Sequence, residues 1–201
     1  LTIPLAKGGI SVTGLDLSSA MLATARSKAH DAGLAVHFEQ ADVRDFRLPK
    51  HFRLVLFPSN AVAHLETERE VESCFRRVAA HLAHGGLLVV HAFNPHEDLL
   101  CRASGDRADV GSFVDSAGLS WTVTETGRYD EQKRIQTLCW AWSAADGRRR
   151  ETELRLRMYW PDDLDEIARR AGLEVLDRVG DFAAAPFTRS ARHQILTLGK
   201  S

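Results

Sequence analysis

Two aspartates follow short strand-like runs in the first quarter of the chain. Asp16 ends the run at 11–16, and Asp42 comes soon after a second run at 35–39. A carboxylate at the carboxyl end of a parallel strand lies at the ligand crevice of an open α/β sheet, where it can accept hydrogen bonds from both hydroxyls of a ribose. The stretch between the two runs has room for one helix, so both aspartates should lie at the same edge of the sheet.

The chemistry open to this pair is recognition of an adenosine. Asp42 can accept a hydrogen bond from an adenine amino group, while the backbone N–H of Val43 can reach a ring nitrogen. Each aspartate also has a simpler explanation, since Asp16 could cap the following helix and Asp42 could be a solvated turn residue. The two together, each after its own strand, are more specific for a nucleoside than either is alone.

The apolar pattern of the first half of the chain predicts the elements that position these aspartates. The strand-like runs are residues 11–16, 35–39, 52–57 and 87–93. Helix-like stretches separate the first from the second and the third from the fourth. The earlier helix should end at Gly33, and the later one should begin at the capping box of Thr67 and Glu70 and end at Gly85-Gly86. This alternation of strands and helices predicts an α/β fold with a parallel sheet.

The pattern changes after Pro95. Residues 97–118 look irregular, and three runs then alternate with a period of two, which is typical of strands. These runs lie near 120–126, 134–143 and 152–160. With a turn signal at 145–147 between the last two, they predict a small antiparallel sheet inserted into the parallel one.

The end of the chain returns to the helix and strand pattern of the first half. A helix is expected to begin at Pro161 and to end at Gly172. Residues 173–179 and 193–198 then have the apolar runs of two final strands. We expect both of these strands to join the main sheet.

Several segments, in this order, carry a resemblance to a known family: VTGLDLSSAMLATARSKA, ADVRDF, LVLFPSNAVAHL, GGLLVVHAFNP and the closing segment from Met158 onward. The chain resembles the class I S-adenosylmethionine-dependent methyltransferases that act on small molecules. The resemblance implies an α/β fold with a Rossmann-like methyltransferase sheet, helices on both faces, an antiparallel last strand and a small antiparallel β insert. It also implies a single domain over 1–201, in which 97–158 is an inserted, substrate-covering β subdomain.

The resemblance also assigns roles to residues at the expected sheet edge. It implies that Asp16 holds the cofactor ribose and that Asp42 and Val43 recognise the adenine edge. Leu17 and Met21 would line the adenine pocket, although both could equally be plain core residues.

The loop after the expected strand at 52–57 is implied to face the methionine part of the cofactor and the reacting methyl group. Its residues are Phe57, Ser59, Asn60 and His64. The resemblance makes Asn60 and His64 the candidates for catalysis, and His64 is the one that could act as a general base within hydrogen-bond reach of the acceptor. The alternative for His64 is a structural role in the loop.

The family's glycine-rich loop has no counterpart in the sequence. This loop normally follows the first strand and lets the backbone approach the methionine part of the cofactor. Here residues 1–9 resemble the helix that comes after the loop, so we expect the first strand to be absent from the chain. Three arrangements remain open: the segment lies upstream, the family's second and fourth strands close up on each other, or another chain fills the gap.

We therefore expect methyl transfer from S-adenosyl-L-methionine to a small-molecule acceptor by in-line displacement. This reaction asks the protein mainly for alignment and exclusion of water, so it is compatible with the lack of an obvious acid–base cluster. One rival is a non-catalytic, truncated methyltransferase fold that acts as a binding or oligomerisation module. A second rival is a nicotinamide-dependent oxidoreductase, which Asp16 suggests and Asp42 opposes.

Composition narrows the partners and the location. A net charge of -1 and the lack of a basic arm oppose a nucleic-acid partner. No apolar run approaches the ~20 residues that a membrane span needs, so no membrane partner is expected. Three widely spaced cysteines are typical of a reduced, cytoplasmic protein. A gap in the sheet makes a homo-oligomer plausible.

Three further features carry weaker signals. The histidines lack companion ligands, so no metal site is expected. The arginines at 148–150 make the insert locally basic, which would either draw an anionic substrate or keep a hairpin edge solvated. The tryptophans of the insert could line a substrate pocket or form the insert's own core. They are Trp121, Trp140, Trp142 and Trp160.

Overall fold

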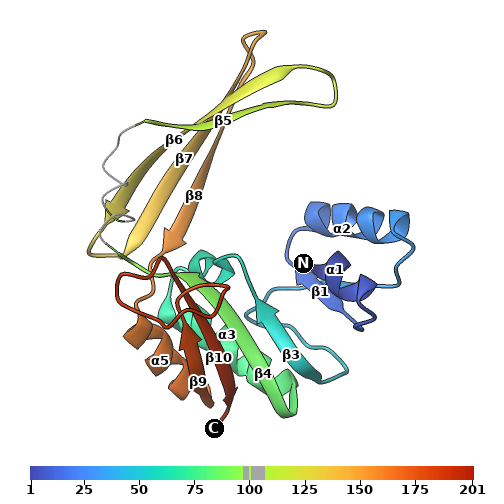
Figure 1. Ribbon diagram of the computed structural model, residues 1–201, viewed down its shortest axis with the longest axis vertical. Coiled ribbons are helices and arrows are strands. Elements are labelled where there is room, and N and C mark those ends of the chain that lie inside the picture. The colour runs from blue at the N-terminus through green and yellow to red at the C-terminus, as the bar shows by residue number, and fades with distance from the viewer. Residues whose placement is uncertain (97–99, 101–106) are drawn as a thin grey trace.

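The computed structural model describes residues 1–96, Leu100 and 107–201. Within these residues the strands form three sheets, of order β1-β2, β3-β4-β10-β9 and β5-β6-β7-β8 (Figure 1). The strands are β1 Thr13–Asp16, β2 His37–Gln40, β3 Phe52–Phe57, β4 Leu82–Phe93, β5 Ala108–Val114, β6 Ser120–Asp130, β7 Ile135–Ala144, β8 Arg149–Arg157, β9 Leu173–Val179 and β10 His193–Lys200. The helices are α1 Thr2–Lys7, α2 Ser19–Asp31, the 3-10 helix η1 Ala61–His64, α3 Glu68–His81 and α5 Pro161–Arg170.

The two-stranded sheet forms one unit with α2. β1 and β2 are parallel, and their register places Asp16 opposite Gln40. Helix α2 connects them, and the Ser18 side chain caps it by accepting a hydrogen bond from the Met21 amide. The chain leaves α2 at Gly33, whose φ of +66° favours glycine. The strand, helix and strand expected in this region are therefore confirmed.

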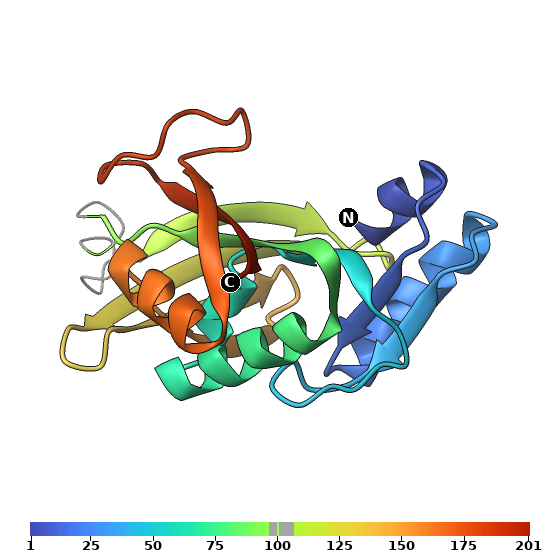
Figure 2. The same ribbon diagram turned by 90° about the horizontal axis from the view of Figure 1, so that it is seen from below.

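The sheet β3-β4-β10-β9 holds the main core. β3 is parallel to β4, whereas β10 runs antiparallel to both β4 and β9, which confirms the antiparallel last strand. Helices α3 and α5 pack on one face of this sheet, side by side in Figure 2. The capping box of Thr67 and Glu70 begins α3 as the sequence indicated. Core residues at helical spacing on α3 include Val71, Phe75 and Val78.

The glycine pair after α3 has a different role from the expected one. Helix α3 ends at His81, and Gly85 and Gly86 lie inside β4. A Cβ at Gly86 would lie 2.8 Å from the Phe52 carbonyl oxygen, and Gly85 has a φ of +67°. The β3–β4 register shifts in this region, between Phe52 and Leu54. The prediction that these glycines end the helix was wrong, because they let the backbones of β3 and β4 come close at an irregular point of the sheet.

β1 and β3 belong to different sheets in the described part of the chain. Each pairs with one partner strand, β1 with β2 and β3 with β4. β1 and β3 correspond to the second and fourth strands of the family's sheet. Of the three arrangements left open by the sequence, the one in which these two strands pair with each other was therefore wrong. The two sheets share apolar packing instead, because Leu15, Ala41 and Val43 lie against the core under α3.

The inserted sheet, here called the insert sheet, is a four-stranded antiparallel meander of β5 to β8. Its last three strands were expected from the sequence, as was the turn at 145–147. The Ala144 amide closes this turn by donating a hydrogen bond of 2.8 Å to the Arg148 carbonyl. β5 was missed, because residues 97–118 were expected to be irregular. Every side chain of β5 is exposed, so its sequence has no buried face to alternate with an open one. Residues 97–99 and 101–106 of that stretch lie outside the described residues.

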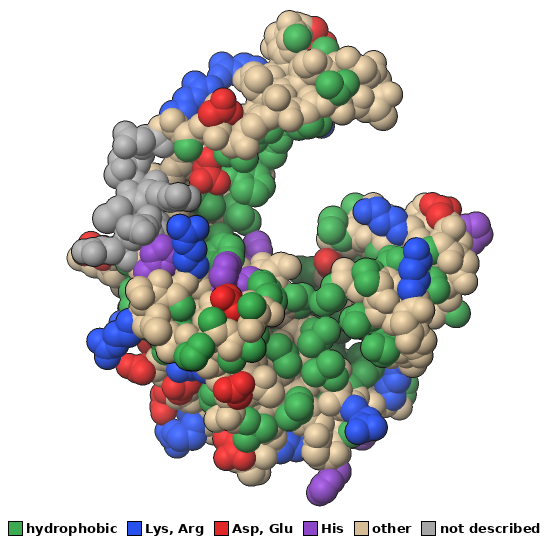
Figure 3. Space-filling view, viewed as in Figure 1, with side chains coloured by type: hydrophobic (Ala, Val, Ile, Leu, Met, Phe, Trp, Pro, Cys, Tyr) green, Lys and Arg blue, Asp and Glu red, His purple; other side chains and the backbone are tan. Residues whose placement is uncertain are grey.

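The insert sheet is joined to the main body at η1. Leu156 and Met158 form a small buried cluster with Ala63 of η1, and Tyr129, Leu138 and Leu154 pack against it. Those residues define the inner face of the insert sheet. Figure 3 shows a deep hollow between this sheet and the rest of the molecule, with hydrophobic side chains along its wall. No described helix has the length and apolar character needed to cross a membrane.

Candidate active site

Asp16 ends β1 at the carboxyl edge of the two-stranded sheet. Its Oδ1 accepts a hydrogen bond of 2.8 Å from the Ser18 amide, so one carboxylate oxygen fixes the turn into α2. The Asp16 carbonyl accepts the Ala41 amide at 3.2 Å. This backbone bond holds the loop that carries Asp42 beside Asp16, as the spacing of the two aspartates predicted.

Asp42 is held by the arginine two residues later. The Arg44 guanidinium donates to both carboxylate oxygens at 2.6 to 3.0 Å, and the Arg44 amide donates to Oδ1 at 2.8 Å. The hydrogen bond from the Arg44 side chain, followed by the one from its amide, lowers the pKa of Asp42. Arg44 also pairs with Glu70 at the start of α3. Asp42 is therefore an ionised, fixed acceptor, and an adenine amino group would share its oxygens with Arg44.

Leu17 and Met21 do not belong to the core. Their exposed fractions are 64% and 61%, so the interpretation of them as plain core residues was wrong. Leu17 directly follows Asp16 at the turn into α2, and Met21 lies in the first turn of that helix. Two large apolar side chains left open beside a carboxylate are suited to cover the faces of a ring.

The loop after β3 has an unusual backbone. Phe57 ends the strand, and Ser59 and Asn60 both have a φ near +57° (57° and 58°), a region that L residues rarely adopt. The Asn60 side chain is 5% exposed, and its Oδ1 accepts the Phe93 amide at 2.9 Å. The Asn60 amide donates to the His91 carbonyl at 3.1 Å. Asn60 thus fastens the loop to the end of β4, and its side-chain oxygen is already occupied.

His64 is the exposed residue at the end of η1. Its neighbour Ala63 is buried against the insert sheet, while His64 itself is exposed. Leu65 follows, and its carbonyl accepts the buried Tyr159 hydroxyl. His64 is therefore placed on a short helix that is anchored on both sides of it. Figure 3 shows histidine side chains gathered at the base of the hollow.

His91 and His193 form a pair that the sequence analysis did not identify as a site. His91 on β4 is 7% exposed, and its Nε2 lies 3.1 Å from Nδ1 of His193 at the start of β10. Phe93 and the exposed Phe182 pack around them. Burial, and then the charge of His193, lower the pKa of His91. The signal in the sequence was a polar residue within the apolar run 87–93.

The basic residues of the insert sheet are mostly paired with carboxylates. Arg155 binds Glu66 with two hydrogen bonds of 2.9 and 2.8 Å, and Arg157 lies 3.5 Å from Glu68. Arg148 pairs with Asp146 in the β7–β8 turn. The Arg155 and Arg157 pairs tie β8 to the segment after His64, whereas the Arg148 pair stays within the turn.

Two other findings concern the described residues. Among them, no cluster of three or more metal-ligating side chains is present. A depression of about 230 Å³ lies on the outer face of the insert sheet, with Thr124, Cys139 and Glu151 in its lining. None of the residues that line it belongs to η1.

The comparisons with known proteins agree with this geometry. Residues 1–86 match a family model described as a methyltransferase domain. The first 86 residues of the chain are therefore similar to a methyltransferase domain. A solved S-adenosylmethionine-dependent methyltransferase from Clostridium acetobutylicum has the same fold, with a TM-score of 0.82 at 16% identity over 98% of this chain and 78% of that one.

Two curated relatives extend the match. A dTDP-3-amino-3,4,6-trideoxy-alpha-D-glucopyranose N,N-dimethyltransferase from Streptomyces venezuelae is 40% identical over 77 residues, which is 38% of this chain and 31% of that protein. The match thus spans less than a third of that relative. Cypemycin N-terminal methyltransferase from a Streptomyces species is 26% identical over 196 residues, covering 96% of this chain and 76% of that protein.

The buried histidine pair should make folding stability depend on pH. The neutral form of His91 is favoured in the folded state, so the unfolded chain takes up a proton first as the pH falls through about 6.5. The free energy of unfolding should therefore be at its full value well above pH 6.5 and should fall as the pH drops from about 7.5 to about 5.5. Urea unfolding of the His91→Phe variant should show a smaller drop over this window than the unsubstituted protein.

The matched control for this measurement is His30→Gln, which removes an exposed histidine from the end of α2. It should keep the full drop in stability between pH 7.5 and 5.5. An equal drop in the His91→Phe variant and in the unsubstituted protein would contradict the assignment.

Proposed function

We propose that this protein transfers a methyl group from S-adenosylmethionine to an amine of a small molecule. The observation that carries the proposal is the edge formed by β1 and β2, where the Asp16 and Asp42 loops are held together by the Asp16–Ala41 backbone bond. Exposed Leu17 and Met21 lie at the same edge. Carboxylate acceptors beside uncovered apolar side chains are what an adenosine requires.

The residues present fit the adenosine half of this cofactor. One oxygen of Asp16 is engaged by the Ser18 amide, which leaves the other to accept from a ribose hydroxyl. Leu17 and Met21 would cover the adenine, and Asp42 with the backbone of Val43 would read its edge. When bound, S-adenosylmethionine supplies an electrophilic methyl group on sulfur. Its methionine part would face the loop of Phe57, Ser59 and Asn60.

His64 is the candidate base in this proposal. It is exposed, whereas the residues on either side of it are buried and anchored. When the acceptor nitrogen forms its bond to the methyl carbon and the carbon–sulfur bond breaks, the nitrogen must lose a proton. The His64 imidazole would accept that proton or orient the amine before transfer. Asn60 would act by holding the loop, since its Oδ1 already accepts the Phe93 amide.

An amine is proposed as the acceptor because two relatives methylate nitrogen by name. One is an amino-sugar N,N-dimethyltransferase, and the other methylates the N-terminus of cypemycin. The insert sheet, which lies within the range 97–158, would cover the acceptor in the hollow of Figure 3. The rival of a non-catalytic module is not favoured, because the residues for adenosine lie together at one edge.

Cofactor binding can be tested by calorimetric titration with S-adenosylhomocysteine. We expect saturable one-site binding that Asp16→Asn weakens about tenfold or more, because a hydrogen bond to a charged acceptor contributes ~1.5–3 kcal/mol. Asp31→Asn, at the exposed end of α2, is the matched control and should bind normally. Binding that is indifferent to Asp16 would overturn the proposed adenosine site.

Catalysis can be tested by transfer of a labelled methyl group to a panel of amino sugars and amino-terminal peptides. His64→Asn should lower turnover about 100-fold, in the range typical for loss of a general base. Its affinity for S-adenosylhomocysteine should stay within about twofold, because His64 would contact the acceptor rather than the cofactor. The control is His84→Asn, an exposed substitution in β4. Unchanged turnover in His64→Asn would remove this residue from the mechanism.

A further inference from the structure

The inner face of the insert sheet continues outward from the contact with η1. Leu156 lies opposite Gln136 and belongs to the cluster that includes Ala63. Side chains on one face of a strand recur every second residue. Leu138 and Leu154 therefore form the next row on this face, and the row after it pairs Trp140 with Glu125 across β6 and β7. This row lies on the same face of the insert sheet as the contact with Ala63.

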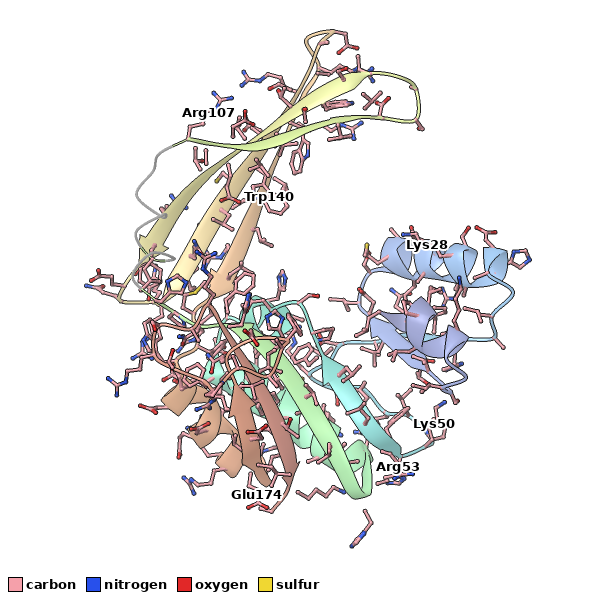
Figure 4. All side chains as sticks on the ribbon, in the orientation of Figure 1. Lys28, Lys50, Arg53, Arg107, Trp140 and Glu174 are labelled. Carbon is pink, nitrogen blue, oxygen red and sulfur yellow. The ribbon has the colours of Figure 1, made fainter. Side chains whose placement is uncertain are left out.

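Trp140 and Trp142 form a corner on this face. Their ring centroids lie 6.0 Å apart, and the rings meet at 83°. The Trp140 indole N–H donates to a carboxylate oxygen of Glu125. Both indoles are partly exposed, so they are not the buried core of the insert. Figure 4 places the labelled Trp140 in the middle of the insert sheet.

Trp121 on the same sheet behaves differently. It is buried, stacks on Phe113 and donates its indole N–H to Asp115. Guanidinium groups of Arg148 and Arg150 lie over its ring, at 5.8 and 5.5 Å from the centroid. This tryptophan has a structural role and already holds cations. Within the described residues, no such cation lies over Trp140 or Trp142.

The carboxylate at this corner belongs to Glu125. In the described part of the chain, Glu125 makes no ion pair with a lysine or arginine, whereas Glu66 and Glu153 do. Arg150 lies one row further out on this face, opposite Trp142, where it packs over Trp121. A carboxylate beside two perpendicular indole faces is the arrangement that attracts an organic cation.

We propose that Glu125, Trp140 and Trp142 form a binding site for an alkylammonium group. The ligand is a protonated amine of the acceptor, at the end remote from the nitrogen that His64 faces. This inference rests on the proposed function for its link to methyl transfer. The Trp140 row lies about 13 Å along the strands from the Leu156 row, at ~3.3 Å per residue. The acceptor is therefore a diamine whose two nitrogens lie on the order of 13 Å apart.

Charge complementarity also separates this acceptor from a nucleotide-linked sugar. A diphosphate at the remote end would lie beside Glu125, and like charges in a partly desolvated site repel. The site therefore selects a cationic acceptor over an anionic one. This makes the acceptor chemically different from the dTDP-linked amino sugar named for the Streptomyces venezuelae relative.

Choline and its neutral isostere 3,3-dimethylbutanol are the probes that test this site. Titration of the 15N-labelled protein should shift the indole N–H signals of Trp140 and Trp142 with choline and leave them in place with the isostere. Glu125→Gln keeps an acceptor for the indole and should weaken choline binding about fivefold or more. Glu151→Gln, on the opposite face of β8, is the matched control and should bind choline normally.

Several outcomes would overturn the inference. They are equal shifts with both probes, no shift at Trp140 and Trp142, or unchanged choline affinity in Glu125→Gln. If Glu125→Gln fails to fold, Trp142→Phe replaces it and should show the same loss. Choline binding without S-adenosylhomocysteine binding would leave the cation site standing and remove the proposed function. S-adenosylhomocysteine binding without choline binding would overturn the cation site and leave the proposed function standing.

Discussion

Leu15, Ala41 and Val43 pack against the core that α3 and α5 build on the larger sheet, and the position of the candidate cofactor site depends on this contact. Among the described residues, β1 and β3 share no hydrogen-bonded ladder. Apolar burial is non-directional, so it can join two sheets without aligning their strands. The pairing of Arg44 with Asp42 and Glu70 adds a directional link between the same two parts.

The second junction joins the insert sheet to the main body at η1, and it also combines apolar burial with an ion pair. The apolar cluster of Ala63, Leu156 and Met158 supplies the burial, and the Arg155–Glu66 pair fixes orientation. An exposed ion pair contributes ~0–1 kcal/mol, so the apolar contact carries more of the stability. His64 lies between these contacts, and the inner face of the insert sheet rises from the same point. One short helix thus sets the position of the candidate base relative to both walls of the hollow.

The sequence predicted those features in which a local rule and the fold agree. The capping box of Thr67 and Glu70 is a local hydrogen-bonding pattern, and it begins α3 as expected. Asp16 and Asp42 could be placed at one edge because parallel strands fix where their ends lie. Gly85 was misread because positive φ ends helices and also permits a strand irregularity, and the sequence does not separate the two.

Features that depend on tertiary neighbours could not be read from the sequence. Arg44 follows Asp42 closely, but its bridge to Glu70 requires α3 to be in place. The exposure of Leu17 and Met21 depends on what packs beside them, and His91 pairs with His193 through strand register. β5 has no buried face, so its pairing with β6 left no apolar alternation to detect.

The central claim is that adenosine binds at the edge shared by β1 and β2. A crystal structure of the protein with S-adenosylhomocysteine tests it most directly. The account predicts that the ribose hydroxyls donate to Asp16, with the adenine between Leu17 and Met21 and its amino group at Asp42. Adenosine bound elsewhere, for example against Phe182 and the His91–His193 pair, would contradict it.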